Sequence, residues 1–453
     1  MEENSKQISY KSIFGPKLIV KELLEYFSIS HIAKLEVLNK FLNEKFRSTY
    51  LSCYDNVEII ASEFMDIDKF LNFIYWYEQR INENPSSFFL CINSYHMKDQ
   101  ICEKFRNEFL QSMEKLFLKM TQNCKQLRSL RINMVRQHGE KVNDSMCNLI
   151  VPLLDQIVRF EQERSDEVFL ENVQIQSTAN SEMIRLICML ENLRILKITN
   201  CSYLTGEFLQ NLKSKKLSTL DFSSSYQIEY DQILQCVLNN SATIDTLYLD
   251  GEYMRSEQFN KLIENLHDIK EFGIFFGNKI KDKFLINLTA VVSHQLLHKL
   301  LIRKAQKLNN TAFEHFFTAK LPSLRYLRLD DCRQLLDSSV VLISQNCSNL
   351  RSLSLNWCQL LQDDGVSSIL VKCKELKKLN LIGLKKLQDQ AFEAALQIEK
   401  DLSTQNMAPR TALDSLKKLN LSECDYVNDS LLFKIKRNHQ SMRIINYYKE
   451  EVE

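Results

Sequence analysis

The chain has 453 residues, 45% of them hydrophobic, which is enough to bury the cores of two or three ordinary domains or of one extended array of repeats. A formal net charge of +1, from 58 basic and 57 acidic side chains, gives no general attraction to nucleic acid or to an anionic membrane. No apolar run reaches the roughly 18 residues of a membrane-spanning helix, and the polar start MEENSKQISY is unlike a secretory signal, so we expect a soluble protein of the cell interior.

The first predicted elements are helices between Pro16 and Phe46, in PKLIVKELLEYFSISHIAKLEVLNKFLNEKF. They separate at SISH, where Ser30 can cap the second helix. The apolar positions that would form one buried face are Leu23, Leu24, Phe27, Ile32, Leu35, Leu38, Phe41 and Leu42. A small helical bundle of this kind either docks onto a partner protein or covers the end of a repeat array.

Residues 51–123 are aromatic and helical in pattern. The stretch KFRNEFLQSMEKLFLKM, from Lys104 to Met120, has apolar residues three and four positions apart, which predicts a helix with one buried face. We expect this segment to be a helical bridge between the N-terminal helices and the rest of the chain.

From Leu127 onward the pattern L-x-x-L-x-L recurs, with other apolar residues allowed in place of leucine. Its start positions are Leu127, Leu170, Leu193, Leu217, Ile244, Ile269, Leu297, Leu324, Leu350, Leu376, Leu416 and Met442. The intervals between Leu170 and Met442 average about 27 residues, a period typical of repeat proteins. No further repeat can be placed in the longer interval between Leu127 and Leu170.

Each repeat predicts a short strand followed by a helix. The alternating x-L-x-L-x part puts its leucines on one face of a strand, and about ten residues later an apolar segment such as Val366, Ile369 and Leu370 has helical spacing. One unit cannot bury its apolar face alone, so the units must stack. The expected fold is an α/β solenoid, a horseshoe with parallel inner strands, outer helices and a continuous core between them.

Seven of the thirteen cysteines keep fixed places in the repeat. Four follow the last apolar residue of the strand by three positions, and three precede the first by three positions: Cys201, Cys332, Cys358 and Cys424, then Cys124, Cys347 and Cys373. A thiol at such a corner can be buried while facing backbone polar groups. Because these cysteines are spread along the solenoid, one per repeat, they are expected to be structural and to bind no metal.

These repeats resemble a known family. CSNLRSLSLNWCQLLQDDGVSSILVKC and CKELKKLNLIGLKKLQDQAFEAAL look like the cysteine-containing class of leucine-rich repeats that is typical of F-box proteins. The resemblance is specific between Leu324 and Met442, whereas between Leu170 and Leu297 it implies the architecture alone.

The N-terminal helices in turn resemble an F-box. Pro16, Tyr26 with Phe27, Ile32, Leu35, Leu38, and Lys40 with Phe41 fall in the places that the motif requires. The segment departs from the motif at Gly15, where a leucine usually precedes the proline, and at Leu18, where an acidic residue is common. The resemblance implies docking onto the Skp-type adaptor of a cullin ubiquitin ligase through Pro16, Leu23, Leu24, Phe27, Ile32, Leu35 and Leu38. A cap with no partner is the alternative.

A protein partner is expected on the concave face, where the residues beside the strand leucines point away from the core. Aromatic and arginine side chains with both signs of charge gather there, a composition typical of binding hot spots. The predicted partner-binding residues are Tyr248, Asp250, Phe275, Lys299, Arg303, Tyr326, Arg328 and Asp330. A face that is merely solvated is the alternative.

One repeat is longer than the others. The interval from Leu376 to Leu416 includes EKDLSTQNMAPRTALDS, which is either a functional surface loop or a tolerated insertion. The lysine pairs Lys377 with Lys378 and Lys417 with Lys418 recur with the repeat and are interpreted as solvated.

The predicted domains are an F-box-like segment at 1–50, the helical bridge at 51–123 and the solenoid with its C-terminal cap at 124–453. No glycine-rich phosphate loop is present, so we expect no enzyme, cofactor or small-molecule substrate. The expected function is an F-box-like substrate receptor that presents a protein to a cullin-type ubiquitin ligase. The alternative is a scaffold subunit of a large assembly, such as the F-box-like repeat proteins of the nexin-dynein regulatory complex in cilia. The location is cytoplasmic in either case, in the cytosol or in the cytoskeleton or cilium.

Overall fold

The computed structural model describes residues 56–60, 71–75, 87–92, 103–123, 127–134, 140–163, 170–177, 179–225, 227–292, 296–404 and 411–452. The chain divides into two compact units, Met1–Leu217 and Ser218–Glu453. The predicted adaptor-binding residues Pro16, Leu23, Leu24, Phe27, Ile32, Leu35 and Leu38 lie outside the described residues, as does Cys124.

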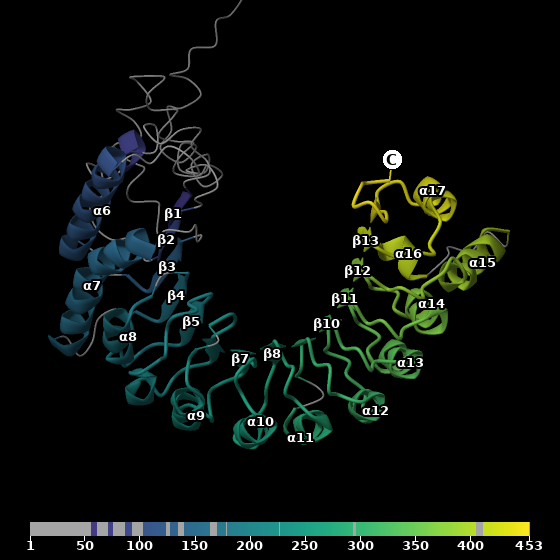
Figure 1. The fold of residues 1–453 in the computed structure, drawn as a ribbon, viewed down its shortest axis with the longest axis horizontal. Coiled ribbons are helices and arrows are strands. Elements are labelled where there is room, and N and C mark those ends of the chain that lie inside the picture. Colours follow the sequence, from purple (N-terminus) through teal and green to yellow (C-terminus); the bar gives the residue numbers. More distant parts are fainter. Residues whose placement is uncertain are drawn as a thin grey trace, which may run out of the picture. The chain divides into compact units, whose positions relative to one another are not determined.

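The first unit is a sheet of parallel strands with helices between them (Figure 1). Its described strands pair in chain order and are β1 (Asn56–Ile60), β2 (Ser87–Ile92), β3 (Ser129–Met134), β4 (Asn172–Gln176) and β5 (Ile195–Thr199). Its described helices include α6 (Glu103–Asn123), α7 (Glu140–Glu163), α8 (Ser181–Cys188) and the 3₁₀ turn η3 (Leu209–Asn211).

Two sequence expectations change in this unit. Residues 51–123 contain the paired strands β1 and β2 as well as helix α6, so the expectation of helices alone is wrong there. The parallel sheet begins before Leu127, and the aromatic residues help to build its core, where the buried rings of Phe88 and Phe117 meet edge to face at 6.2 Å. The long interval between Leu127 and Leu170 is filled by the 24-residue helix α7, and β3 pairs directly with β4.

The second unit repeats one strand-and-helix element along its whole length (Figure 1). Its described strands, parallel and paired in chain order, are β6 (Thr219–Asp221), β7 (Thr246–Asp250), β8 (Glu271–Phe275), β9 (Lys299–Arg303), β10 (Tyr326–Asp330), β11 (Ser352–Ser354), β12 (Lys378–Asn380), β13 (Lys418–Asn420) and β14 (Arg443–Ile445). Its described helices are α9 (Tyr230–Asn239), α10 (Ser256–Ile263), α11 (Asp282–Val291), α12 (Asn310–Phe317), α13 (Asp337–Asn346), α14 (Asp363–Lys372), α15 (Gln390–Thr404), α16 (Ala412–Ser415) and α17 (Asp429–Asn438). The strands line the inner side of this unit and the helices its outer side.

The predicted core is confirmed. Leu350, Leu353 and Leu355 are fully buried, and Ile369 and Leu370 of α14 are buried with them. Burying one such side chain contributes roughly 1.5–3 kcal/mol, so the repeating leucines supply the main stabilising term of each unit. The last repeat is one residue out of the predicted register, because Leu419 of β13 pairs with the buried Ile444 rather than with Ile445.

The cysteines form a ladder of weak hydrogen bonds between repeats. The Cys358 thiol donates to the Leu329 carbonyl of the preceding repeat at 2.9 Å, and Cys424 donates to Leu381 at the same distance. Burial raises the pKa of the Cys424 thiol to about 11 and that of Cys373 to about 12, so these thiols stay protonated at neutral pH. The six described cysteines that keep the repeat positions are all buried, as the repeat pattern predicted.

Aspartates at the starts of the helices also form hydrogen bonds to the next repeat. Asp363 is the first residue of α14, and its Oδ1 also accepts a hydrogen bond from the Gln388 N–H of the next repeat at 2.7 Å. Asp389 accepts in the same way from Asn428 at 2.9 Å.

The long interval after Leu376 holds the end of α15 and the short helix α16, while residues 405–410 lie outside the described residues. No helix among the described residues is long and apolar enough to cross a membrane.

Candidate functional site

The eight predicted partner-binding residues lie together on four adjacent strands of the second unit. We call the side of these strands that faces away from the helices the β7–β10 face. Three rows of side chains cross it in register: Thr246, Glu271, Lys299 and Tyr326; Tyr248, Gly273, Leu301 and Arg328; Asp250, Phe275, Arg303 and Asp330.

Tyr248 is largely covered by this chain itself. Its ring lies across the backbone of β8, where a Cβ added to Gly273 would be 2.3 Å from the Tyr248 Cδ1. The hydroxyl donates to Glu271 Oε2 at 2.5 Å, and the Lys299 ammonium lies 4.9 Å from the ring centroid. Burial and the carboxylate of Glu271 raise the pKa of the Tyr248 hydroxyl. With 6% of its surface exposed, Tyr248 orders the face and offers a partner little area.

Asp330 is the centre of a polar network. It is 5% exposed, and its Oδ1 accepts hydrogen bonds from the Ser354 hydroxyl at 2.6 Å and the Asn356 N–H at 3.2 Å. Its Oδ2 accepts from Arg328 Nε and lies 3.7 Å from Arg303 Nε. One buried carboxylate thus holds two guanidinium groups on the face.

The Arg303 side chain is partly buried. Its guanidinium carbon is 5.6 Å from the ring centroid of Phe275, and burial together with the neighbouring Arg328 lowers the pKa of its side chain. Its buried Nε makes no hydrogen bond within the part of the chain that the structure describes. Two guanidinium groups against one carboxylate leave this part of the face positively charged.

The accessible side chains are fewer than the sequence predicted. Tyr326 is 46% exposed and projects from the face, whereas Asp250 is buried, with its pKa raised to about 6 by that burial. Leu301, which sequence analysis missed, is half-buried beside Arg328 and adds apolar surface. The strand alternation marked its position, since it stands between Leu300 and Ile302, which are both fully buried.

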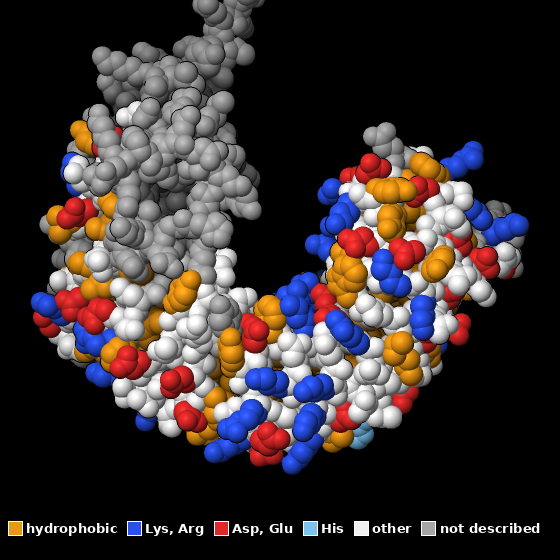
Figure 2. Space-filling view, viewed as in Figure 1, with side chains coloured by type: hydrophobic (Ala, Val, Ile, Leu, Met, Phe, Trp, Pro, Cys, Tyr) orange, Lys and Arg blue, Asp and Glu red, His pale blue; other side chains and the backbone are white. Residues whose placement is uncertain are grey.

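A second feature lies at the beginnings of strands β10–β13. Six basic side chains are exposed or half-buried there and form what we call the basic band: Arg325, Arg351, Lys377, Lys378, Lys417 and Lys418. Lys378 and Lys418 are register neighbours, and lysine and arginine side chains gather along the inner side of this region (Figure 2). Further along, Arg443 pairs with Glu451 at 2.8 Å, but the six residues of the basic band have no ion pair among the described residues.

The arrangement of strands and helices defines the fold class. The chain has an α/β leucine-rich-repeat fold, with parallel strands on the inner side of its repeats and helices on the outer side. No protein-family model matches the chain, and no curated protein matches it.

Solved structures do resemble it. The chain is similar to one in the crystal structure of the Rad7 and Elc1 complex in yeast, with a TM-score of 0.53 and 16% identity over 96% of this chain and 93% of that chain. A second match is the functional domain of InlJ from Listeria monocytogenes, which includes a cysteine ladder, at 12% identity and a TM-score of 0.29 over 74% of this chain and 69% of that chain. The first likeness shows a shared fold.

Proposed function

We propose that the chain is a non-enzymatic protein-protein interaction module whose β7–β10 face binds a protein partner. The observation that carries this proposal is the exposed Tyr326, which lies on the same side of β10 as Arg328. Arg328 and, on the neighbouring strand β9, Arg303 are held in place by the buried Asp330. Tyrosine and arginine are enriched among residues that dominate binding energy. Because the sheet and the carboxylate fix these side chains before binding, a partner loses little of its affinity to ordering them.

The basic band supports a more specific form of the partner. These six cations have no carboxylate partner in the part of the chain that the structure describes, so they repel one another, and an acidic segment would relieve that repulsion. We therefore propose that the partner places an acidic stretch along the starts of β10–β13 while an apolar or aromatic group meets Tyr326 and Leu301.

We further propose that the N-terminal segment docks onto a Skp-type adaptor and that the chain is an F-box-like substrate receptor of a cullin-type ubiquitin ligase. The resemblance of Pro16, Leu23, Leu24, Phe27, Ile32, Leu35 and Leu38 to an F-box supports this. The solved structure that the chain resembles holds Rad7 in a complex with Elc1, so a protein of this fold does assemble with a second protein.

A structural scaffold is the second candidate. The departures from the F-box pattern at Gly15 and Leu18 favour it, because a subunit built into a large assembly, such as an axonemal complex, has no need of an adaptor. Fractionation separates the two functions. A receptor is recovered with adaptor and cullin in the cytosolic fraction, whereas a scaffold stays with a salt-resistant particle.

The face is tested by affinity capture with wild-type protein and the Tyr326→Ala variant. Loss of a hot-spot tyrosine costs about 2 kcal/mol or more, which is roughly 30-fold in affinity, while the melting temperature should barely change because the ring is exposed. Tyr426→Ala is the matched control, since this tyrosine is 61% exposed on the loop after β13. If every protein captured by the wild type is also captured by Tyr326→Ala, the face is not the binding site.

The adaptor is tested by co-purification of a Skp-type protein with full-length chain and with Leu24→Asp, Phe27→Asp double variant. We expect the adaptor with the wild type and its loss with the variant, because a buried apolar face does not accept two charges. A wild-type chain recovered without adaptor under gentle lysis would rule out docking and leave the proposal for the β7–β10 face standing.

A further inference from the structure

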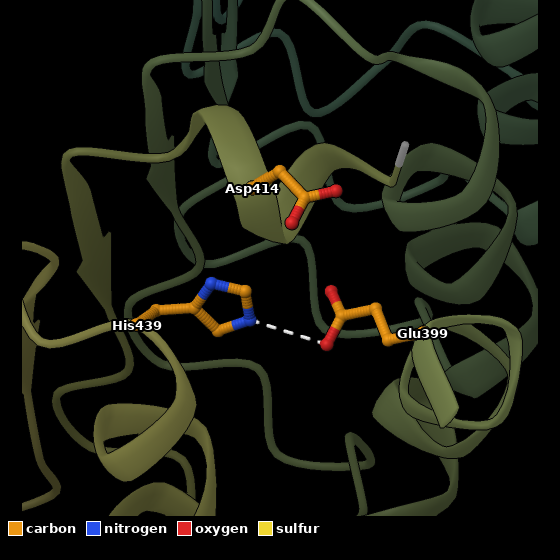
Figure 3. Close-up of side chains that lie close together, drawn as sticks. All are labelled: Glu399, Asp414 and His439. Atoms are coloured by element: carbon orange, nitrogen blue, oxygen red, sulfur yellow. Dashed lines mark hydrogen bonds and ion pairs between the residues drawn. The ribbon is translucent and has the colours of Figure 1, made fainter. Parts of the chain in front are cut away.

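Three potential metal ligands meet at the C-terminal end of the second unit. Glu399 comes from α15, Asp414 from α16, and His439 is the residue that ends α17 (Figure 3). One ligand atom of each lies within 4.8 Å of the other two. The three side chains point toward one another from three separate helical segments.

Glu399 is held in a fixed orientation. It is 7% exposed, and its Oε1 accepts a hydrogen bond from the Thr411 hydroxyl at 2.8 Å. Its other oxygen, Oε2, lies 3.2 Å from His439 Nε2. A ligating carboxylate in proteins is typically supported by such an outer hydrogen bond, which orients it and keeps its free oxygen directed at the ion.

Asp414 provides the open side of the group. It is exposed, and its Oδ2 accepts a hydrogen bond from the Thr411 N–H at 3.0 Å. A cavity of about 1210 Å³ adjoins the three residues and is lined also by Glu393, Lys400 and Lys434. The cavity gives an ion a path of entry and leaves room for water.

We propose that Glu399, Asp414 and His439 bind one divalent transition-metal ion, for which Zn²⁺ is the best candidate, with water completing the coordination. One imidazole nitrogen and two carboxylate oxygens suit Zn²⁺, whereas Ca²⁺ and Mg²⁺ prefer oxygen ligands alone. Metal bonds of about 2.1 Å in a tetrahedral site place neighbouring ligand atoms roughly 3.4 Å apart, close to the 3.2 Å between His439 Nε2 and Glu399 Oε2.

The ion would join the segment inserted after α15 to the last helix of the unit. Without metal, the His439 ring forms a hydrogen bond with Glu399. Zn²⁺ needs the neutral imidazole, so a proton competes for the same nitrogen. The carboxylates of Glu399 and Asp414 face it, and the charged side chains that also line the adjoining cavity are Asp389, Glu393, Lys400 and Lys434.

The test is calorimetric titration of ZnCl₂ into full-length, chelator-treated protein at neutral pH. We expect one equivalent to bind, and His439→Gln or Asp414→Asn to weaken binding by about 100-fold or more, since even outer-shell changes cost about 10–100-fold. Asp414→Asn guards against misfolding, because Asp414 is exposed and an asparagine oxygen still accepts the Thr411 N–H bond. His315→Gln, an exposed histidine of α12, is the matched control and should leave binding unchanged.

Cobalt separates this site from the cysteines. Co²⁺ bound by His439, Glu399 and Asp414 should show no thiolate-to-metal charge-transfer band, and the melting temperature should rise until one equivalent is bound. No binding by the wild type, binding with a thiolate band, or stoichiometric binding that persists in both His439→Gln and Asp414→Asn would each overturn the proposal.

Discussion

At Gly273 the lack of a side chain lets the ring of Tyr248 lie against the neighbouring strand, and this contact shapes the β7–β10 face. The residue in this row on β9 is Leu301, and on β10 it is Arg328, so a flat aromatic surface gives way to projecting groups within two strands. The residues between the strand leucines therefore determine the shape of the inner surface, because the leucines themselves are buried in the core.

Gly273→Ala should destabilise the protein by about 1–3 kcal/mol, since its Cβ would overlap Tyr248 Cδ1 and force the ring from its place. Denaturant unfolding measures this change. In a Tyr248→Ala background the same substitution should cost much less, because the overlapping ring is gone. Equal costs in the two backgrounds would show that the ring is not what Gly273 accommodates.

At the scale of the element, each repeat is fastened to the next by more than its leucines. Asp363 and Asp389 accept backbone hydrogen bonds from the following repeat, and the thiols of Cys358 and Cys424 donate to carbonyls of the preceding one. Helix starts and strand corners thus carry polar contacts on both sides of the apolar core.

Asp363→Ala should lower the free energy of unfolding by about 0.5–2 kcal/mol, because the Gln388 N–H loses its acceptor and α14 loses a charge at its N-terminus. Asp364→Ala is the matched control: it removes a neighbouring, exposed charge from the same helix turn, so it should cost only the few tenths of a kcal/mol of the dipole effect. Thermal or denaturant unfolding of the two variants compares them, and similar losses would contradict a contact between repeats at Asp363.

Most strands and helices of the repeats could be predicted from the sequence, because the alternation of leucines indicates which residues are buried. Strands β1 and β2 were missed since their alternation, such as the buried Phe88 and Leu90, lacks the leading leucine that marks the later repeats. The role of Asp330 depends on Ser354 and Arg303, which come from other repeats, so its burial could not be predicted from its own strand. The meeting of Glu399, Asp414 and His439 was out of reach for the same reason.

At the scale of the molecule, the near-zero net charge conceals a local excess. The basic band gathers Arg325, Arg351, Lys377, Lys378, Lys417 and Lys418 at the starts of four strands, and none of them forms an ion pair with a described residue. Total charge therefore says little about how this protein would recognise a charged partner, since the repeat places like residues side by side.

Lys378→Glu with Lys418→Glu should weaken binding of the partner captured through the β7–β10 face by about tenfold or more and flatten its dependence on salt, because the acidic segment would meet like charge. Lys320→Glu with Lys372→Glu makes the same change in net charge at exposed positions outside the basic band and is the control. Titrations at several salt concentrations measure both variants. Affinity that is unchanged at low salt in the first variant would refute a role for the basic band.

The buried thiols that connect neighbouring repeats also make it possible to measure where the array opens. A buried, protonated cysteine such as Cys358 or Cys424 reacts with an alkylating reagent only when its repeat separates from the one before it. The rate at which each cysteine is labelled therefore measures how often the two repeats at that junction separate. Terminal repeats have one neighbour fewer, so the order in which the thiols react would read out, without any added probe, the direction in which the array comes apart.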